Sequence, residues 1–228
     1  MTRGQTGSVP AVTTRAVAPR MTRPPRAGVR LVRLYATSRR VPAAAAAIAG
    51  CAVGLRLALI GHWDSYGALQ LPLVFETAAA IAITVTVASP LGEPERITGR
   101  WLPYLRLGAA LMLTAVAIGG LAAAGTGAHL AGGTLDVLRN VAGITGIGLL
   151  CAAAINSGLG WIGPAAYLLP GAYALYTGWH HPALTTPWLW PARPPHDLGA
   201  ALCAGLVFAA GVVVIMARGG RDPTGERA

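Results

Sequence analysis

The chain has 228 residues, of which 54% are hydrophobic and only 11% are charged, with a mean hydropathy of +0.55. About a quarter of the residues of a soluble domain are charged, so this composition excludes an ordinary soluble protein and indicates an all-α protein with several membrane spans. The net charge is +10, and every one of the 18 basic residues is arginine.

The basic charge is concentrated at the N-terminus, where nine arginines and no acidic residue lie within residues 1–40. Residues 1–26 are rich in Arg, Thr, Pro and Gly, a composition typical of a disordered tail. Such a tail could bind nucleic acid or anionic lipid. It has no interleaved aromatic residues and no nucleic-acid-binding motif, so we expect it to anchor the chain on the cytoplasmic side, with no nucleic acid as partner.

Residues 27–40, AGVRLVRLYATSRR, have a helical pattern with two faces. Leu31, Leu34 and Tyr35 share an apolar face, and arginines share another. This pattern predicts a basic amphipathic elbow helix that lies in the membrane interface before the first span. The alternative is that these residues are the frayed start of that span.

Six apolar runs follow, each with about the length needed to cross a bilayer. Their predicted ranges are 41–60, 72–89, 105–124, 135–154, 161–177 and 199–217. The fifth run contains Pro164 and Pro170, which favour a kinked or broken helix. The predicted organisation is therefore a tail (1–26), a six-span membrane domain (27–217) and a second cytoplasmic tail (218–228).

The segment between the second and third spans is abruptly polar and reads GEPERITGRWLP. Acidic residues and a proline at its start suit the first turn of a helix. Ile97 and Trp101 then lie four residues apart on one helix face, and Arg96 and Arg100 lie four residues apart on another. The residues that would form this surface helix are Glu93, Glu95, Arg96, Ile97, Arg100 and Trp101. A short amphipathic helix between two spans is suited to docking a partner protein.

The distribution of arginine predicts the orientation. Six spans put both termini on one side, and that side holds nine arginines in the N-terminal tail, three in residues 93–106 and three in the C-terminal tail. The opposite loops hold only Arg193. The excess of arginine on the cytoplasmic side predicts that both termini are cytoplasmic. Trp179, Trp188 and Trp190 then fall in an external loop and fit an interfacial aromatic belt.

Three charged residues lie inside the predicted spans, and such residues are candidates for a function. Arg56, Glu76 and Arg139 each lie about one helical turn below the external surface. Glu76 is at the right depth for an ion pair with Arg56 or with Arg139. This ion pair would fix the packing of spans one, two and four. The alternatives are a role in substrate passage or proton coupling, and arginines that reach the surface unpaired.

Other chemical sites are not indicated. The histidine-rich loop, with His180, His181, His196 and Asp197, matches no standard metal-ligand spacing. The tripeptide 156–158 invites comparison with intramembrane serine proteases, but the preceding residue is isoleucine instead of glycine and the last span contains no histidine base. The three cysteines lie singly in apolar runs, and no phosphate-binding loop is present. We therefore expect no cofactor and no metal.

The order of these parts resembles the membrane subunit of ABC-2-type ABC transporters over residues 27–217. Members have an elbow helix (here RLVRLYATSRRVPAA), six spans, a coupling helix (here GEPERITGRWLP) and a re-entrant external element before the last span (here HHPALTTPWLWPARPP). The resemblance implies a permease subunit in a bacterial plasma membrane that acts as an exporter. It implies no catalytic site in this chain, a second permease subunit, and a separate ATP-binding subunit docked on Ile97 and Trp101.

Two other functions stay open from the sequence. One is a non-transporting membrane anchor or accessory protein that binds a partner through the same cytoplasmic surfaces. The other is a small proton-coupled secondary transporter that uses Glu76.

Overall fold

The computed structural model describes residues 36–37, 40–61, 67–88, 102–127, 133–177 and 186–218. All the secondary structure in these ranges is helical. The long helices are α2 (Val41–Ile60), α3 (Gly67–Ala88), α5 (Leu102–Ala124), α6 (Gly133–Ala154), α7 (Ile162–Thr177) and α8 (Leu198–Arg218). Two short 3-10 helices, η2 (Ser157–Leu159) and η5 (Trp190–Ala192), precede α7 and α8.

Each predicted apolar run coincides with one long helix. The largest difference is at α3, which begins at Gly67, so that Pro72 lies inside the helix instead of starting it. Of the kink or break predicted in the fifth run, the break is not seen, because α7 is continuous through Pro170. Pro164 is only the third residue of α7, where the missing N–H has no partner within the helix to lose.

The helices have the lengths and surfaces of a membrane protein. Five of those in the described ranges, α2, α3, α5, α6 and α8, are long and apolar enough to cross a bilayer. The remaining long helix, α7, has 16 residues and is about 24 Å long at the usual helical rise. Large apolar side chains such as Leu57, Leu169 and Leu206 are more than 60% exposed on the outer faces. Such faces are expected to contact lipid.

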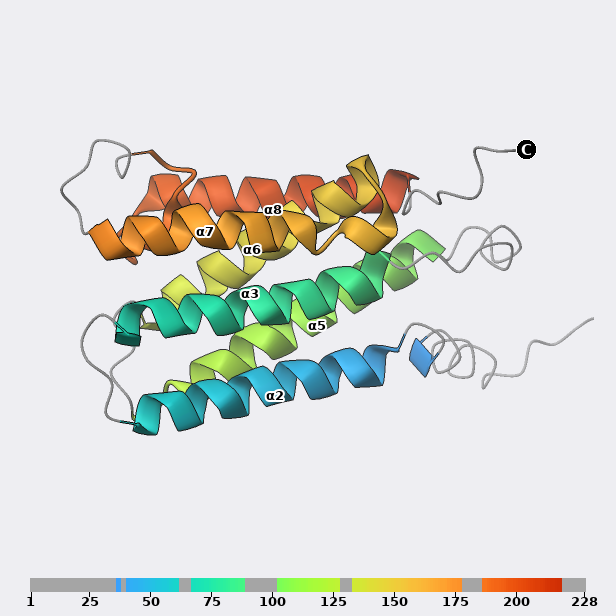
Figure 1. Cartoon of the computed structure of the whole chain (residues 1–228). Helices are drawn as coiled ribbons and strands as arrows, with labels where there is room; N and C mark the ends of the chain where they lie inside the picture. Colours follow the sequence, from blue (N-terminus) through green and yellow to red (C-terminus); the bar gives the residue numbers. More distant parts are fainter. Residues whose placement is uncertain are drawn as a thin grey trace, which may run out of the picture.

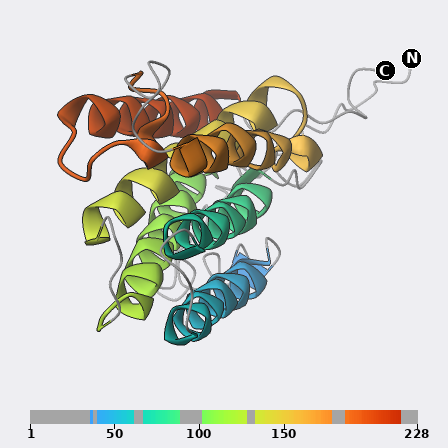
Figure 2. The ribbon, with the colours of Figure 1, turned by 60° about the vertical axis from the view of Figure 1, so that its left-hand side comes forward.

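The helices run alternately in opposite directions, so that the start of α2 and the end of α8 lie at the same end of the bundle (Figure 1). α2 and α8 lie at opposite edges in both views (Figures 1 and 2). α3 and α6 are central: α3 contacts α2, α5, α6 and α7, and α6 contacts α3, α5, α7 and α8. Polar side chains on these two helices are therefore the ones most enclosed by protein.

The α6–α8 contact is close because glycines face it. A Cβ atom on Gly146 would lie 2.6 Å from the backbone of Phe208, and one on Gly211 would lie 2.7 Å from the carbonyl oxygen of Gly146. Small residues let two membrane helices approach backbone to backbone. These two helices therefore pack as one unit.

Several predicted features lie outside the described residues. They include the N-terminal tail, most of the elbow helix, the surface helix up to Trp101 and the C-terminal tail. Pro103 lies in the first turn of α5, a position that suits proline. Arg106 is one of the three arginines of the predicted cytoplasmic segment. It is only 6% exposed, and it donates a hydrogen bond to the carbonyl of Ile215 near the end of α8.

Candidate functional site

Buried polar side chains gather where α3, α6 and the chain before α8 meet. Glu76 on α3 is 2% exposed, and Arg139 and Asn140 on α6 are 3% and 6% exposed. Acidic, basic and amide side chains are almost never this buried unless they are paired. Their partners therefore define the site.

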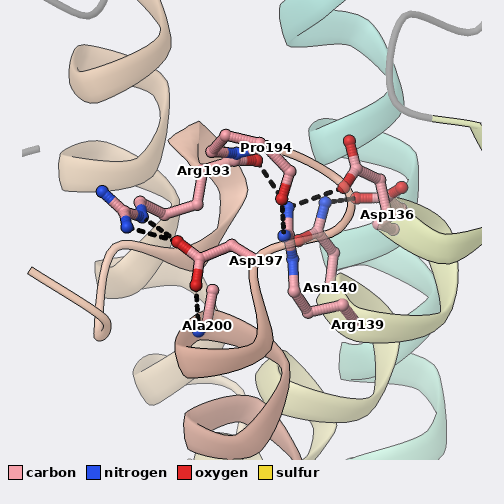
Figure 3. Close-up of polar contacts among 8 residues, drawn as sticks. Asp136, Arg139, Asn140, Arg193, Pro194, Asp197 and Ala200 are labelled. Atoms are coloured by element: carbon pink, nitrogen blue, oxygen red, sulfur yellow. Dashed lines mark hydrogen bonds and ion pairs between the residues drawn. The ribbon is translucent and has the colours of Figure 1, made fainter. Parts of the chain in front are cut away.

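Arg139 connects α6 to the chain that leads into α8 (Figure 3). Its Nη2 forms an ion pair with Asp136 Oδ1 at 2.7 Å and donates to the carbonyl of Arg193 at 3.0 Å. Its Nη1 donates to the carbonyl of Pro194 at 2.8 Å. Asp136 lies in the first turn of α6, where the helix dipole favours a negative charge. One guanidinium therefore holds three acceptors from two elements.

Residues 188–197, here called the fold-back segment, return into the bundle before α8 begins. Trp190 is only 2% exposed, and its ring stacks on that of Tyr167 with the centroids 4.8 Å apart. The hydroxyl of Tyr167 donates to the carbonyl of Trp188 at 2.6 Å. On the α6 side the indole lies over Gly143, where a Cβ atom would come within 2.6 Å of it. The tryptophan is thus a packed core residue.

Asp197 ends the fold-back segment and is the N-cap residue of α8, which begins at Leu198. Its Oδ1 accepts hydrogen bonds from the backbone N–H groups of Gly199 at 2.8 Å and Ala200 at 3.2 Å, and its Oδ2 pairs with Arg193. The bond from Ala200, with those from Arg193 and Gly199, lowers the pKa of this carboxyl below its ordinary value. Asp197 therefore caps the helix in its ionised form.

Glu76 joins α3 to α6 through Asn140, whose Nδ2 donates to Glu76 Oε2 at 2.9 Å. Charged groups near Glu76 are Arg139 and Asp136, which also bind each other. Among the described residues Glu76 therefore forms no ion pair with Arg139. Asp136 lies one helical turn before Arg139 on the same helix, and this nearer carboxylate takes the guanidinium.

Nor does Glu76 form an ion pair with Arg56 among the described residues. Arg56 Nη1 donates to the carbonyls of Ala124 and Thr126, at the C-terminal end of α5. These carbonyls lack partners within the helix and carry its negative dipole end, so they attract a cation. Arg56 lines a groove of about 310 Å³ between α2 and α5, and it takes no part in the cluster around Glu76.

Three atoms of the cluster are buried and have no hydrogen-bond partner within the described part of the chain. They are Asn140 Oδ1, Arg139 Nε and Trp190 Nε1. Nearly all buried polar atoms in proteins have a partner. Asn140 Oδ1 is an acceptor and needs a donor, whereas Arg139 Nε and Trp190 Nε1 are N–H donors and need acceptors.

The other predicted site residues are not placed. The docking residues Glu93, Glu95, Arg96, Ile97, Arg100 and Trp101 all lie outside the described residues, as do His180 and His181. Across the described ranges, no group of three or more His, Cys, Asp or Glu residues is arranged to hold a metal ion.

Sequence reasoning missed Asn140 as part of a site and considered Asp197 only as a metal ligand. It also placed Trp190 in an interfacial aromatic belt, which is wrong because this side chain is only 2% exposed. An uncharged amide and a tryptophan give little signal in an apolar sequence. Asp197 did give one, because an aspartate directly before an apolar helix is a typical N-cap and lies four residues after Arg193. The spacing of Asp136 and Arg139 likewise indicates an ion pair on one helix face.

Comparisons with protein-family models, with curated proteins and with solved structures find no match to this chain. Its function is therefore inferred from its own residues and their geometry.

Proposed function

We propose that the chain is the membrane-spanning subunit of an ATP-driven exporter of the ABC-2 type in a bacterial plasma membrane. In this proposal α7 also crosses the membrane, which makes six spans, the elbow helix lies before α2, and both termini are cytoplasmic. ATP hydrolysis takes place on a separate subunit, and this chain has no catalytic site of its own.

The observation that supports the proposal is the packing of the fold-back segment. The resemblance to ABC-2 permeases calls for a re-entrant element before the last span. Trp190 and Ala192 are 2% and 5% exposed, and Pro191 is also buried, at the contact of this segment with α6, α7 and α8. Arg139 ties this segment to α6. An accessory protein that only presents a cytoplasmic surface has no need of such an element.

The proposed mechanism uses the close α6–α8 contact. Nucleotide binding would move the ATPase, and the surface helix at 93–102 would pass this movement to α3 and α5, the helices that flank it. α6 and α8, which meet at Gly146 and Gly211, would move together and carry the fold-back segment with them. Substrate would pass between two such subunits.

The decisive experiment purifies the tagged full-length protein from its native membranes in mild detergent. We expect a co-purified protein with ATP-binding cassette motifs, and ATP hydrolysis by the complex. Trp101→Ala should release that protein, because a central aromatic residue often dominates the binding of a helix in a groove. The matched control is Trp161→Ala, because Trp161 is 45% exposed at the start of α7 and lies outside the docking segment.

Equal recovery of the ATPase with Trp101→Ala, at equal membrane expression, would contradict the docking role of this residue. Absence of any ATPase from the preparation would contradict the proposal itself and favour an anchor or accessory protein.

A further inference from the structure

Glu76 is the one glutamate within the described residues, and it is buried at the centre of the bundle. It lies on α3 at the contact with α6, and it accepts a hydrogen bond from the side-chain amide of Asn140. No basic side chain in the described ranges forms an ion pair with it. A lone ionised carboxylate in such surroundings is strongly unfavourable.

The nearby charges do not supply a counter-ion. Arg139 and Asp136, the charged groups on α6 closest to Glu76, form an ion pair with each other. Arg139 also donates to the carbonyls of Arg193 and Pro194. An ionised Glu76 would thus leave this part of the bundle with one net negative charge.

The other helices that pack on α3 direct their ionisable groups elsewhere. On α2, Arg56 binds the carbonyls at the end of α5. On α5, Arg106 donates to the carbonyl of Ile215, near the far end of α8. On α7, Tyr167 donates to the carbonyl of Trp188, while Tyr173 is 66% exposed on the outer face.

A second observation comes from Asn140. Its Nδ2 donates to Glu76, but its Oδ1 is buried and has no donor within the described part of the chain. A protonated carboxyl group has one O–H donor and one carbonyl acceptor, which complement the N–H donor and the carbonyl acceptor of a primary amide. A proton on Glu76 would therefore supply the donor that Asn140 Oδ1 lacks, and it would remove the uncompensated charge.

We propose that Glu76 and Asn140 form a proton-binding site, in which Glu76 holds a proton at neutral pH and shares it with Asn140 as a carboxylic acid–amide pair. The proton comes from water and returns to water, and no other bond is made or broken. This site goes beyond the proposed permease function and does not depend on it, because it is built from α3 and α6 alone.

Infrared spectroscopy of the full-length protein, in a detergent without ester groups, tests the site. We expect a carbonyl-stretch band of a protonated carboxylic acid at neutral pH. It should shift when the wild-type protein is labelled with carbon-13 glutamate, and it should disappear in Glu76→Gln. The matched control is Asp197→Asn, which changes a carboxyl that pairs with Arg193 and caps α8, away from Glu76, and should leave the glutamate band in place.

Thermal stability gives an independent measurement. Glutamine has the shape of a protonated glutamate and can form both hydrogen bonds with Asn140, so Glu76→Gln should melt at the same temperature as wild type at mildly acidic pH. The native wild type holds a proton that the unfolded chain releases, so its stability should fall relative to Glu76→Gln as the pH rises. Asn140→Leu should destabilise both forms of the site.

Two results would overturn the proposal. One is a wild-type spectrum at neutral pH without a labelled carboxylic-acid band. The other is a difference in melting temperature between wild type and Glu76→Gln that does not change with pH. The first measurement needs no variant, so the proposal stays testable if Glu76→Gln fails to fold.

Discussion

At the scale of single residues, the interior of this protein depends on glycines as much as on polar contacts. Gly143 makes room for the indole of Trp190, whose ring would lie 2.6 Å from an added Cβ atom, and Ala204 would lie 3.0 Å from it. In contrast, Gly205 on α8 has nothing within 4 Å of an added Cβ atom. The same substitution should therefore have opposite effects at these two helical positions.

We predict that Gly143→Ala lowers the apparent melting temperature of the detergent-solubilised protein. Overpacking a filled interior costs about 1–3 kcal/mol, and this outweighs the gain of roughly 0.5–1 kcal/mol that alanine brings to a helix over glycine. Gly205→Ala, the control, should leave the melting temperature unchanged or raise it. In a Trp190→Leu background, Gly143→Ala should cost less than it does in the wild type, and an equal cost in both backgrounds would mean that the indole is not the obstacle.

At the scale of the elements, the helices were predictable and their pairing was not. Long apolar runs bounded by proline, glycine and charge fix where helices begin and end, and five of the six observed starts lie within three residues of the predicted ones. Which side chains contact one another depends on how each helix is rotated about its axis and on which loop folds back into the bundle. Neither is encoded in periodicity, so the partners of Arg56 and Glu76 could not be predicted, whereas the spacing of Asp136 and Arg139 on one helix does indicate their ion pair.

The fold-back segment gives the prediction at this scale. Arg139→Ala removes the donors that hold the carbonyls of Arg193 and Pro194 and leaves Asp136 without its counter-ion. We expect the segment to open more often. In a variant without native cysteines, a cysteine that replaces Ala192, which is 5% exposed, should then react about tenfold faster or more with a thiol reagent. Such an increase corresponds to a loss of roughly 1.4 kcal/mol in opening free energy.

The control for this experiment is Arg56→Ala, which removes an arginine of the α2–α5 contact and leaves the fold-back segment untouched. It should leave the reaction rate at position 192 unchanged. Equal rates in all three proteins would show that Arg139 does not hold the segment closed.

At the scale of the whole molecule, the alternating helix directions agree with the distribution of arginine. The start of α2, the end of α3, the start of α5 and the end of α8 share one end of the bundle (Figure 1). All the arginine-rich parts of the sequence adjoin these helix ends. Charge asymmetry of this kind sets the orientation of a membrane protein, and it predicts which end is cytoplasmic.

Labelling in intact cells tests the orientation. Thr126 is exposed after the end of α5, and Leu159 is 38% exposed between α6 and α7, near the opposite end. In a cysteine-free background, Thr126→Cys should react with a membrane-impermeant reagent added outside, and Leu159→Cys should react only after the membrane is opened. The reverse pattern would mean an inverted orientation, and reaction of both from outside would exclude an α6 that crosses the membrane.

The dependence of Arg139 on the fold-back segment has a consequence for biosynthesis. α6 leaves the ribosome before residues 193 and 194, so for a time the guanidinium of Arg139 has Asp136 and lacks two of the three acceptors that it has in the finished protein. A guanidinium with donors that lack acceptors is poorly tolerated in lipid. We therefore expect α6 to become stable in the membrane only when the fold-back segment has formed, so that a nascent protein that stops after α7 exposes an unfinished helix to quality-control proteases.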